Sequence, residues 1–191
     1  SSVSFEYGET SVLSGVTFTA PAGQTVALVG STGSGRSTLT NLMMRLDEPS
    51  SGQILLGGVP IEELNPDELR AAVSVAFQES FLFASSISDN VSMGRELTQE
   101  QLDDSLDRSR AGKFVAKLPK AQETILGERG VTLSGGQRQR VALARALAGE
   151  PRVLLLDDAT SAVDPVIEAQ ILAGLRNSDT TMLIVAHRLS T

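Results

Sequence analysis

Residues 30–38, GSTGSGRST, form a glycine-rich loop with phosphate-binding spacing. Gly30 is followed by four residues, then by Gly35, a basic residue and a hydroxyl residue. In such a loop, backbone N–H groups point inward around phosphate oxygens, and the start of the next helix is electropositive. An expected strand at 25–30 and an expected helix at 37–46 favour this interpretation over a flexible Gly/Ser turn. The predicted phosphate contacts are Gly30, Ser31, Thr32, Gly33, Ser34, Gly35, Arg36, Ser37 and Thr38.

Arg36 stands where such a loop normally carries lysine. Lysine is a compact point charge, whereas arginine is a longer, planar fork. The exchange keeps the charge and alters the fit, so we expect nucleotide binding that is retained but weakened. Ser37 is expected to bind Mg²⁺, and Thr38 to help hold the phosphates.

Two adjacent carboxylates, Asp157 and Asp158, follow the apolar run VLLL at 153–156. Alone, this pair would be interpreted as solvated aspartates at the end of a strand. With a phosphate loop upstream, Asp157 is expected to hold Mg²⁺ beside Ser37. Asp158 is then the candidate for positioning or deprotonating the attacking water.

Strands and helices must place these groups together. Apolar runs at 25–30, 152–158 and 181–187, with a weaker one at 73–78, show no apolar/polar alternation. They predict strands buried on both faces of a parallel sheet. Near the amino terminus, the alternating stretches VSFEY and VTFTA predict an antiparallel pair.

Three helices carry start signals in the sequence: Asn65 before Pro66, and the capping-box pairs Thr98/Gln101 and Ser134/Gln137. The pair Thr98/Gln101 stands ahead of the stretch LDDSLDRSRAGKFVAKL at 102–118, over which helix is expected. Helices without a convincing strand fill residues 85–147.

The predicted organisation is a single α/β domain over residues 1–191. Residues 1–84 and 148–191 are expected to form its core, and about 85–147 an inserted helical lobe. The right-handed parallel connections expected of such a core follow from the strand–helix alternation at both ends of the chain.

The composition narrows the function classes. The net charge is −7 over 191 residues, which argues against a general nucleic-acid binder, and no nucleic-acid partner is expected. The longest apolar runs are too short to cross a bilayer, and no leader is recognised at the start of the sequence. There is no cysteine, so disulfides and thiolate metal sites are excluded.

The stretch LSGGQRQRVALARAL at 133–147 closely resembles the signature sequence of ATP-binding cassette (ABC) proteins. In that family, the signature of one subunit closes over ATP held by the phosphate loop of its partner. The resemblance implies that the signature residues contact a nucleotide bound in another domain, although Ser134 would cap its helix in either case. These residues are Ser134, Gly135, Gly136 and Gln137.

Further positions follow in the family's order. Tyr7 resembles the aromatic residue that stacks on adenine, and Gln78 resembles the glutamine that touches Mg²⁺ and the attacking water. Asp164, in SAVD, resembles the acid of the loop that crosses the dimer interface, and His187 resembles the histidine that senses the γ-phosphate. Taken singly, each has a simple structural interpretation; only their place in the series favours the nucleotide roles.

The stretches GERGVTLSGGQ and SFLFASSISDNV resemble the nucleotide-binding domain of exporter-type transporters. The resemblance covers essentially the whole chain and implies a RecA-like phosphate-loop NTPase core with ATP and Mg²⁺ as cofactors. The implied partners are a second nucleotide-binding domain and the coupling helices of a membrane domain, at the cytoplasmic face of a membrane. Family members continue past the histidine motif, so further chain is expected after Thr191.

Two residues depart from the family pattern, which has lysine at Arg36 and glutamate at Asp158. Asp158 withdraws its carboxylate by about 1 Å, and a displacement of that size can cost roughly 10²-fold in rate. Both departures fall in one half-site, as in heterodimeric exporters with one slow site, so a different partner chain is expected. The alternatives are an ATP-dependent regulatory clamp with little hydrolysis and, far behind it, a soluble ABC ATPase of DNA repair or chromosome organisation. The absence of coiled-coil heptads weighs against the last.

Overall fold

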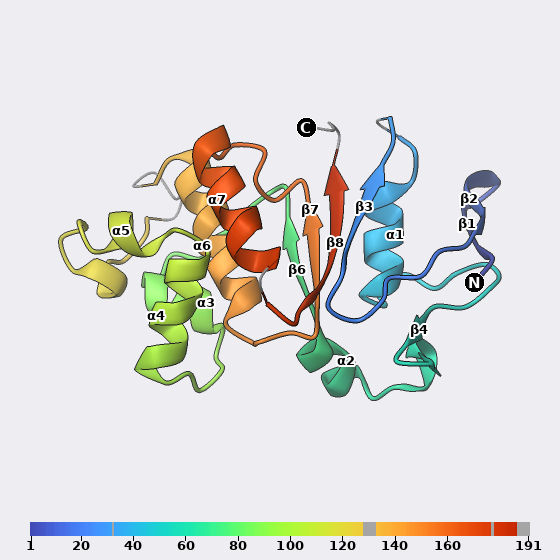
Figure 1. Cartoon of the computed structure of the whole chain (residues 1–191), viewed down its shortest axis with the longest axis horizontal. Helices are drawn as coiled ribbons and strands as arrows, with labels where there is room; N and C mark the ends of the chain where they lie inside the picture. Colours follow the sequence, from blue (N-terminus) through green and yellow to red (C-terminus); the bar gives the residue numbers. More distant parts are fainter. Residues whose placement is uncertain (32, 128–132, 177, 187–191) are drawn as a thin grey trace.

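The computed structural model describes residues 1–31, 33–127, 133–176 and 178–186. A four-stranded parallel sheet has the order β3-β8-β7-β6 and stands at the centre of Figure 1. All four strands coincide with the four apolar runs, so the predicted parallel sheet is confirmed. The strands are β3 (Thr25–Val29), β6 (Val73–Phe77), β7 (Val153–Asp157) and β8 (Thr181–Ala186).

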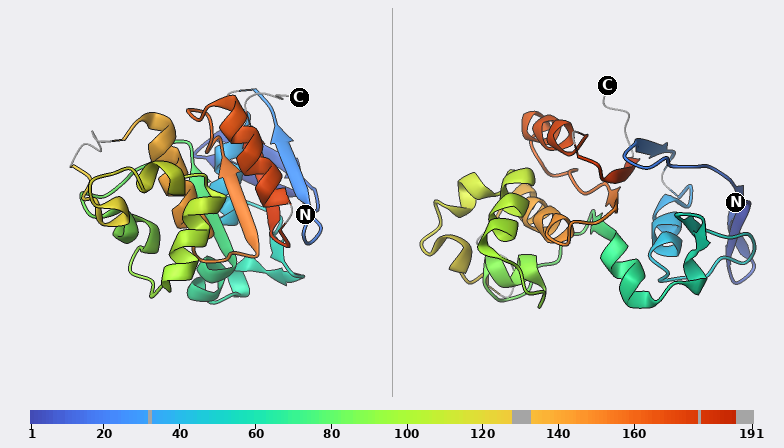
Figure 2. Two further views of the ribbon diagram at one scale, coloured as in Figure 1. Left: turned by 60° about the vertical axis from the view of Figure 1, so that its left-hand side comes forward. Right: turned by 60° about the horizontal axis from the view of Figure 1, so that its bottom comes forward.

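Helices cover both faces of the sheet, which explains why the strand sequences do not alternate. Successive residues of β7 point to opposite faces. Leu154 and Leu156 pack in one apolar cluster with α6 and α7, whereas Leu155 packs in another with residues of α1 and α2 (Figures 1 and 2). Each face therefore buries leucine. The helices are α1 (Arg36–Met43), α2 (Pro66–Ala72), α6 (Gly135–Leu147) and α7 (Pro165–Arg176).

A second, helical unit lies against α6 on the side away from the sheet (Figure 1). Its apolar cluster includes Ile87, Val91 and Leu106, and α6 contributes Val141 and Ala144 to it. The same helix turns other side chains to the sheet, so α6 joins the two units. The helices of the unit are α3 (Ile87–Ser92), α4 (Gln99–Arg108), α5 (Gly112–Val115) and the short 3₁₀ turn η2 (Ala121–Glu123).

Sequence expectations about the helical stretch after Thr98 and about the second amino-terminal strand are wrong. The helical stretch expected over 102–118 consists of two helices, α4 and α5, because Arg110 adopts a left-handed φ of 59° that a helix cannot contain. The second amino-terminal strand is not VTFTA: β1 (Val3–Tyr7) pairs with β2 (Thr10–Val16) through a two-residue turn at Gly8 and Glu9. Gly8 has a φ of 61°, which glycine adopts readily in such a turn.

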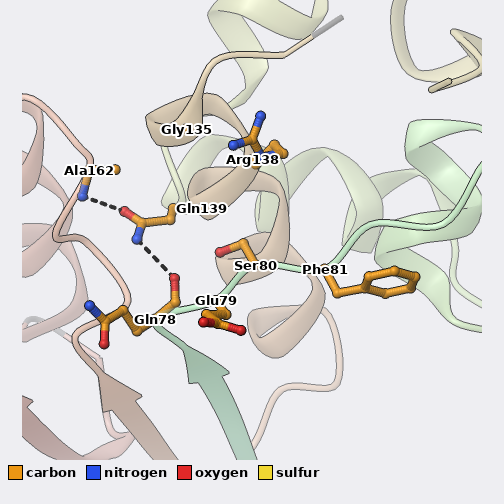
Figure 3. A pocket seen from close by; sticks show the side chains of 8 residues that line it. All are labelled: Gln78, Glu79, Ser80, Phe81, Gly135, Arg138, Gln139 and Ala162. Carbon is orange, nitrogen blue, oxygen red and sulfur yellow. Dashed lines mark hydrogen bonds between the residues drawn. The ribbon is translucent and has the colours of Figure 1, made fainter. Parts of the chain in front are cut away.

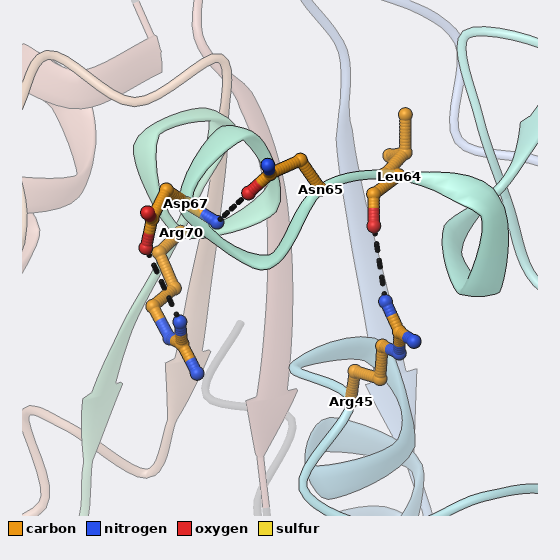
Figure 4. A network of polar contacts seen from close by, with 5 residues as sticks. All are labelled: Arg45, Leu64, Asn65, Asp67 and Arg70. Atoms are coloured by element: carbon orange, nitrogen blue, oxygen red, sulfur yellow. Dashed lines mark hydrogen bonds and ion pairs between the residues drawn. The ribbon is translucent and has the colours of Figure 1, made fainter.

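The predicted helix starts are present. The Asn65 side chain accepts a hydrogen bond from the Asp67 amide at 2.9 Å (Figure 4). Helices α4 and α6 both have complete capping boxes. Helix α1 ends at Met43, before the expected residue 46. Arg45 then reaches across and donates to the Leu64 carbonyl at 3.0 Å, tying the end of α1 to the turn before α2 (Figure 4). Between them lie β4 (Leu55–Leu56), β5 (Val59–Pro60) and the 3₁₀ turn η1 (Ile61–Glu63).

Candidate nucleotide site

The carboxyl ends of all four strands meet at one edge of the sheet. Val29 pairs with Ala186, and Asp157 pairs with both Val185 and Phe77. The phosphate loop, Asp157 and Gln78 therefore leave the sheet on the same side, where ligands bind in open α/β sheets. At ordinary strand spacing, β3 lies about 10 Å from β7 and about 14 Å from β6. A group the size of a triphosphate with its metal fits this span.

The phosphate loop needs its glycines for two physical reasons. Gly33 and Gly35 have φ values of 82° and 83°, in the left-handed region that side chains disfavour. In addition, a Cβ at Gly35 would lie 2.6 Å from Cδ2 of Leu13 in β2. The amino-terminal hairpin thus packs directly on the loop. Thr32 lies outside the described residues.

Helix α1 begins immediately after this loop. Its N-cap, Gly35, makes no side-chain cap, so the amides of the first turn have no capping side chain and can bind an anion. Ser37 is exposed in this turn and Thr38 is half-buried. Arg36 is only 9% exposed, and its Nη2 lies 3.5 Å from the carbonyl of Ser31. The guanidinium therefore folds back along the loop.

The two carboxylates occupy distinct positions. Asp157 is the last residue of β7 and is 7% exposed. Asp158 adopts a φ of 47°, and its amide donates to the Val185 carbonyl at 3.0 Å, so the chain turns sharply as it leaves the strand. Aspartate tolerates this left-handed backbone better than most residues.

The oxygen donors at this edge suit Mg²⁺. Among the described residues, no group of three or more His, Cys, Asp or Glu could form a metal cage. Mg²⁺ is usually bound by one or two carboxylates together with substrate phosphates and water. The Asp157 carboxylate, the Ser37 hydroxyl and the Gln78 amide oxygen match that donor set.

Gln139, a buried residue of α6 that is 5% exposed, was not recognised as a site residue from the sequence. Its side-chain N–H groups donate to the Gln78 carbonyl at 3.2 Å and to Oγ of Ser161 at 3.0 Å. Its side-chain oxygen, Oε1, accepts a hydrogen bond from the Ala162 backbone amide at 2.8 Å (Figure 3). The available signal was its spacing: Gln139 lies three residues after Gly136, on the same helix face.

The signature residues form the beginning of α6. Oγ of Ser134 accepts from the Gln137 amide at 3.2 Å, and the Gln137 side chain accepts from the Ser134 amide at 2.8 Å. Gly136 lies against Ala162. Since α6 joins the β6 edge through Gln139 and Gln78, the signature stands at the opposite edge from the phosphate loop after β3.

Two further expected site residues have roles within the chain. Asp164 accepts from the Val166 amide at 2.9 Å and begins α7. Tyr7 is 52% exposed and packs edge to face on Phe5, so it is not a core residue of its strand. Its ring is accessible for stacking. His187 lies outside the described residues.

A cavity of about 400 Å³ opens between the segment after β6 and the start of α6 (Figure 3). Phe81, at its margin, is 66% exposed and contacts Phe83 edge to face. Arg145 holds this segment in place by donating to the Phe81 carbonyl at 3.0 Å and to the Asn90 carbonyl at 2.7 Å. Burial, with the nearby charge of Arg95, lowers the pKa of the Arg145 guanidinium. The cavity is lined by Gln78, Glu79, Ser80, Phe81, Gly135, Arg138, Gln139 and Ala162.

Comparison with known proteins connects this geometry to one family. The family described as "ABC transporter" matches residues 13–161. The mycobactin import ATP-binding/permease protein IrtB of Mycolicibacterium thermoresistibile is 43% identical over 192 residues, covering 99% of this chain and 33% of that protein. The β-(1→2)glucan export ATP-binding/permease protein NdvA of Rhizobium etli is 43% identical over 193 residues, with the same two coverages.

The fold is likewise similar to a solved transporter. The structure of a bacterial Atm1-family ABC exporter with ATP bound superimposes with a TM-score of 0.93 at 39% identity, covering 99% of this chain and 34% of that one. The chain thus spans about a third of the length of these relatives. Within the described residues, none of the helices has the length and apolarity needed to span a bilayer.

Proposed function

Because the chain belongs to the ABC transporter family, we propose that it binds Mg-ATP on its phosphate loop and pairs head to tail with a second nucleotide-binding domain. The chain is an exporter-type nucleotide-binding domain, an ATP hydrolase of the ABC class. The observation that carries the proposal is the separation of its two anion sites. The phosphate loop follows β3 and the signature adjoins β6, at opposite edges of one sheet. A partner domain in the reverse orientation brings a signature to each phosphate loop.

In the proposed site, the phosphate-loop residues and Tyr7 bind the nucleotide. Ser37, Asp157 and Gln78 hold Mg²⁺, which when bound neutralises phosphate charge. Gln78, Asp158 and His187 act on the attacking water and the γ-phosphate. Ser134, Gly135, Gly136, Gln137 and Asp164 serve the nucleotide of the partner.

We propose that hydrolysis in this chain's own site is slow. Arg36 is buried along the loop, and its planar guanidinium does not reproduce the point charge of lysine. The Asp158 side chain is one methylene shorter than glutamate, so its carboxylate reaches about 1 Å less far into the site. Both departures lie in the same half-site, whereas the signature is unaltered. The partner with a competent site is then a different chain.

The proposed attachment to a membrane domain uses the surface around the cavity after β6. Phe81 and Phe83 expose apolar rings there, and a coupling helix that covers them would bury apolar area. This surface adjoins Gln78, so docking reaches the nucleotide site directly. The domain then works at the cytoplasmic face of a membrane and powers export of a substrate that the membrane domain selects.

Steady-state ATP turnover tests this proposal. It is measured against protein concentration for the wild type and for the Arg36→Lys/Asp158→Glu double variant. We expect near-background turnover in the wild type, and turnover in the double variant that rises as the protein dimerises. Equal rates per site in both proteins would contradict the slow site and favour a symmetric exporter.

A regulatory clamp is the second candidate, favoured by the same two departures at Arg36 and Asp158. Such a clamp dimerises on ATP without turning it over. It is distinguished by a double variant that still does not hydrolyse ATP, although sedimentation shows an ATP-dependent dimer.

A further inference from the structure

Phe77 and Asp157 are the last residues of β6 and β7, and they form the last pair between these two strands. The segment after β6 and the loop after β7 leave the sheet at this pair. Beyond that pair, the ladder no longer fixes one segment relative to the other. Gln78 and Asp158, the first residues past it, are the candidate catalytic groups. The Asp158 amide still donates to the Val185 carbonyl of β8 at 3.0 Å, so what a contact outside the sheet has to fix is the Gln78 segment relative to the loop that follows Asp158.

Gln139 supplies that contact. Through three hydrogen bonds of 2.8–3.2 Å it joins Gln78 on one side to Ser161 and Ala162 on the other. The carboxamide uses both its N–H groups and its oxygen, so its orientation follows from chemistry. A reversed amide would point an N–H at the Ala162 N–H.

The same helix face is held against the loop by close packing. A Cβ on Gly136 would lie 2.5 Å from the Ala162 carbonyl oxygen, and one on Gly135 would lie 3.4 Å from Cβ of Ala162. The start of α6 therefore cannot move far without moving the loop after β7. Gln139 extends this rigid contact to the end of β6.

We propose that Gln139 is a positioning residue that joins α6, the Gln78 segment and the Asp158 loop into one unit. Contact of the signature with a partner's nucleotide is then transmitted through Gln139 to the catalytic groups of this chain's own site. This transmission rests on the proposed function; the positioning itself does not, because it depends only on contacts within the chain.

Two substitutions remove different parts of the contact. Gln139→Met keeps the volume and removes all three hydrogen bonds. Gln139→Glu keeps an acceptor for the Ala162 amide and removes both donors. Ser109→Ala is the matched control: Ser109 is buried and donates to the Leu106 carbonyl at 3.0 Å, in the helical unit and away from the site.

Amide hydrogen exchange on the full chain reads the positioning without any activity. In Gln139→Met, we expect amide exchange to become roughly fivefold faster in segments 78–84 and 158–164, which is the loss of protection expected from one missing hydrogen bond. Exchange in α4 should stay at the wild-type rate. Ser109→Ala should leave both segments unchanged. Equal rates in Gln139→Met and wild type, or an equal rise in Ser109→Ala, would overturn the proposal.

Turnover reads the transmission, and it is measured in the Arg36→Lys/Asp158→Glu background. Adding Gln139→Met or Gln139→Glu should lower kcat about tenfold or more and leave the KM for ATP within about threefold, because misplaced groups slow the chemistry and spare the phosphate loop. The proposed transmission would be overturned if kcat stayed unchanged in the Gln139 variants. It would also be overturned if Ser109→Ala changed kcat and KM in the same way as the Gln139 variants. Binding of a fluorescent ATP analogue to the wild type distinguishes this result from failure of the proposed function. If the wild type does not bind the analogue, the proposed function is wrong, and the hydrogen-exchange experiment alone tests the positioning role of Gln139.

Discussion

Gly136 and Ala162 approach so closely that a Cβ at position 136 would come within 2.5 Å of the Ala162 carbonyl oxygen. Because that atom is backbone, the contact can be relieved only by moving the loop after β7 or the start of α6. Gly136→Ala is therefore expected to reduce stability by about 1–3 kcal/mol and, in the Arg36→Lys/Asp158→Glu background, to lower ATP turnover. Chemical denaturation and steady-state hydrolysis measure the two effects.

Gly174→Ala is the control for this substitution. Gly174 is exposed in α7, and a Cβ there meets only a side-chain nitrogen of Arg110 at 4.0 Å. Alanine at this position should stabilise the fold by about 0.5–1 kcal/mol, as in an ordinary helix interior. Destabilisation at both glycines would show that close packing on Ala162 is not the cause.

Ser134 and Thr98 cap their helices in the same way, which separates capping from nucleotide contact. Both Ser134→Ala and Thr98→Ala remove an N-cap of a complete capping box and should each cost about 1 kcal/mol of stability. In the Arg36→Lys/Asp158→Glu background, only Ser134→Ala is expected to lower turnover as well, by about tenfold or more, because the proposed function gives its hydroxyl a contact with the partner's nucleotide. Thermal melts and hydrolysis assays of the two variants give the comparison, and equal turnover would restrict Ser134 to capping.

Arg36 supplies the charge of the phosphate loop. Arg36→Ala should weaken binding of a fluorescent ATP analogue about 10- to 100-fold, the loss expected for hydrogen bonds to a charged group. Arg70→Ala removes an exposed arginine whose partner is Asp67 at 3.5 Å, and it should leave binding unaltered. A loss of binding in both variants would point to net charge rather than to this site.

Arg145 anchors the segment that carries Phe81. Arg145→Met leaves the carbonyls of Phe81 and Asn90 without these donors and should cost about 2–3 kcal/mol of stability. Arg108→Met removes a surface pair with Asp104 in α4 and should cost about 0.5 kcal/mol or less. Denaturation midpoints measure the difference, and similar losses would contradict the anchoring role.

The strands were predictable because their signal is local. Leu154, Leu155 and Leu156 are adjacent in the sequence and already indicate burial on both faces. The helix starts at Asn65, Thr98 and Ser134 were predictable for the same reason, since a cap and its partner lie two or three residues apart.

What the sequence did not predict depends on distant residues. Gln139 acquires its role from Gln78, 61 residues away, and from Ala162, 23 residues away. The break at Arg110 is, by contrast, a local helix end, where the Ala111 amide donates to the Leu106 carbonyl at 2.7 Å, and Gly112 was the signal in the sequence that could have marked it.

The strand order has a consequence for how the chain reaches its structure. β8 lies between β3 and β7, although its residues are synthesised more than 150 positions after those of β3. Until Thr181–Ala186 has left the ribosome, β3 has no neighbour on that side and exposes unpaired backbone groups. Such non-local pairing folds slowly and leaves strand edges open to association. The nascent chain therefore carries its phosphate loop on an unfinished sheet, whose β3 edge stays open until β8 inserts.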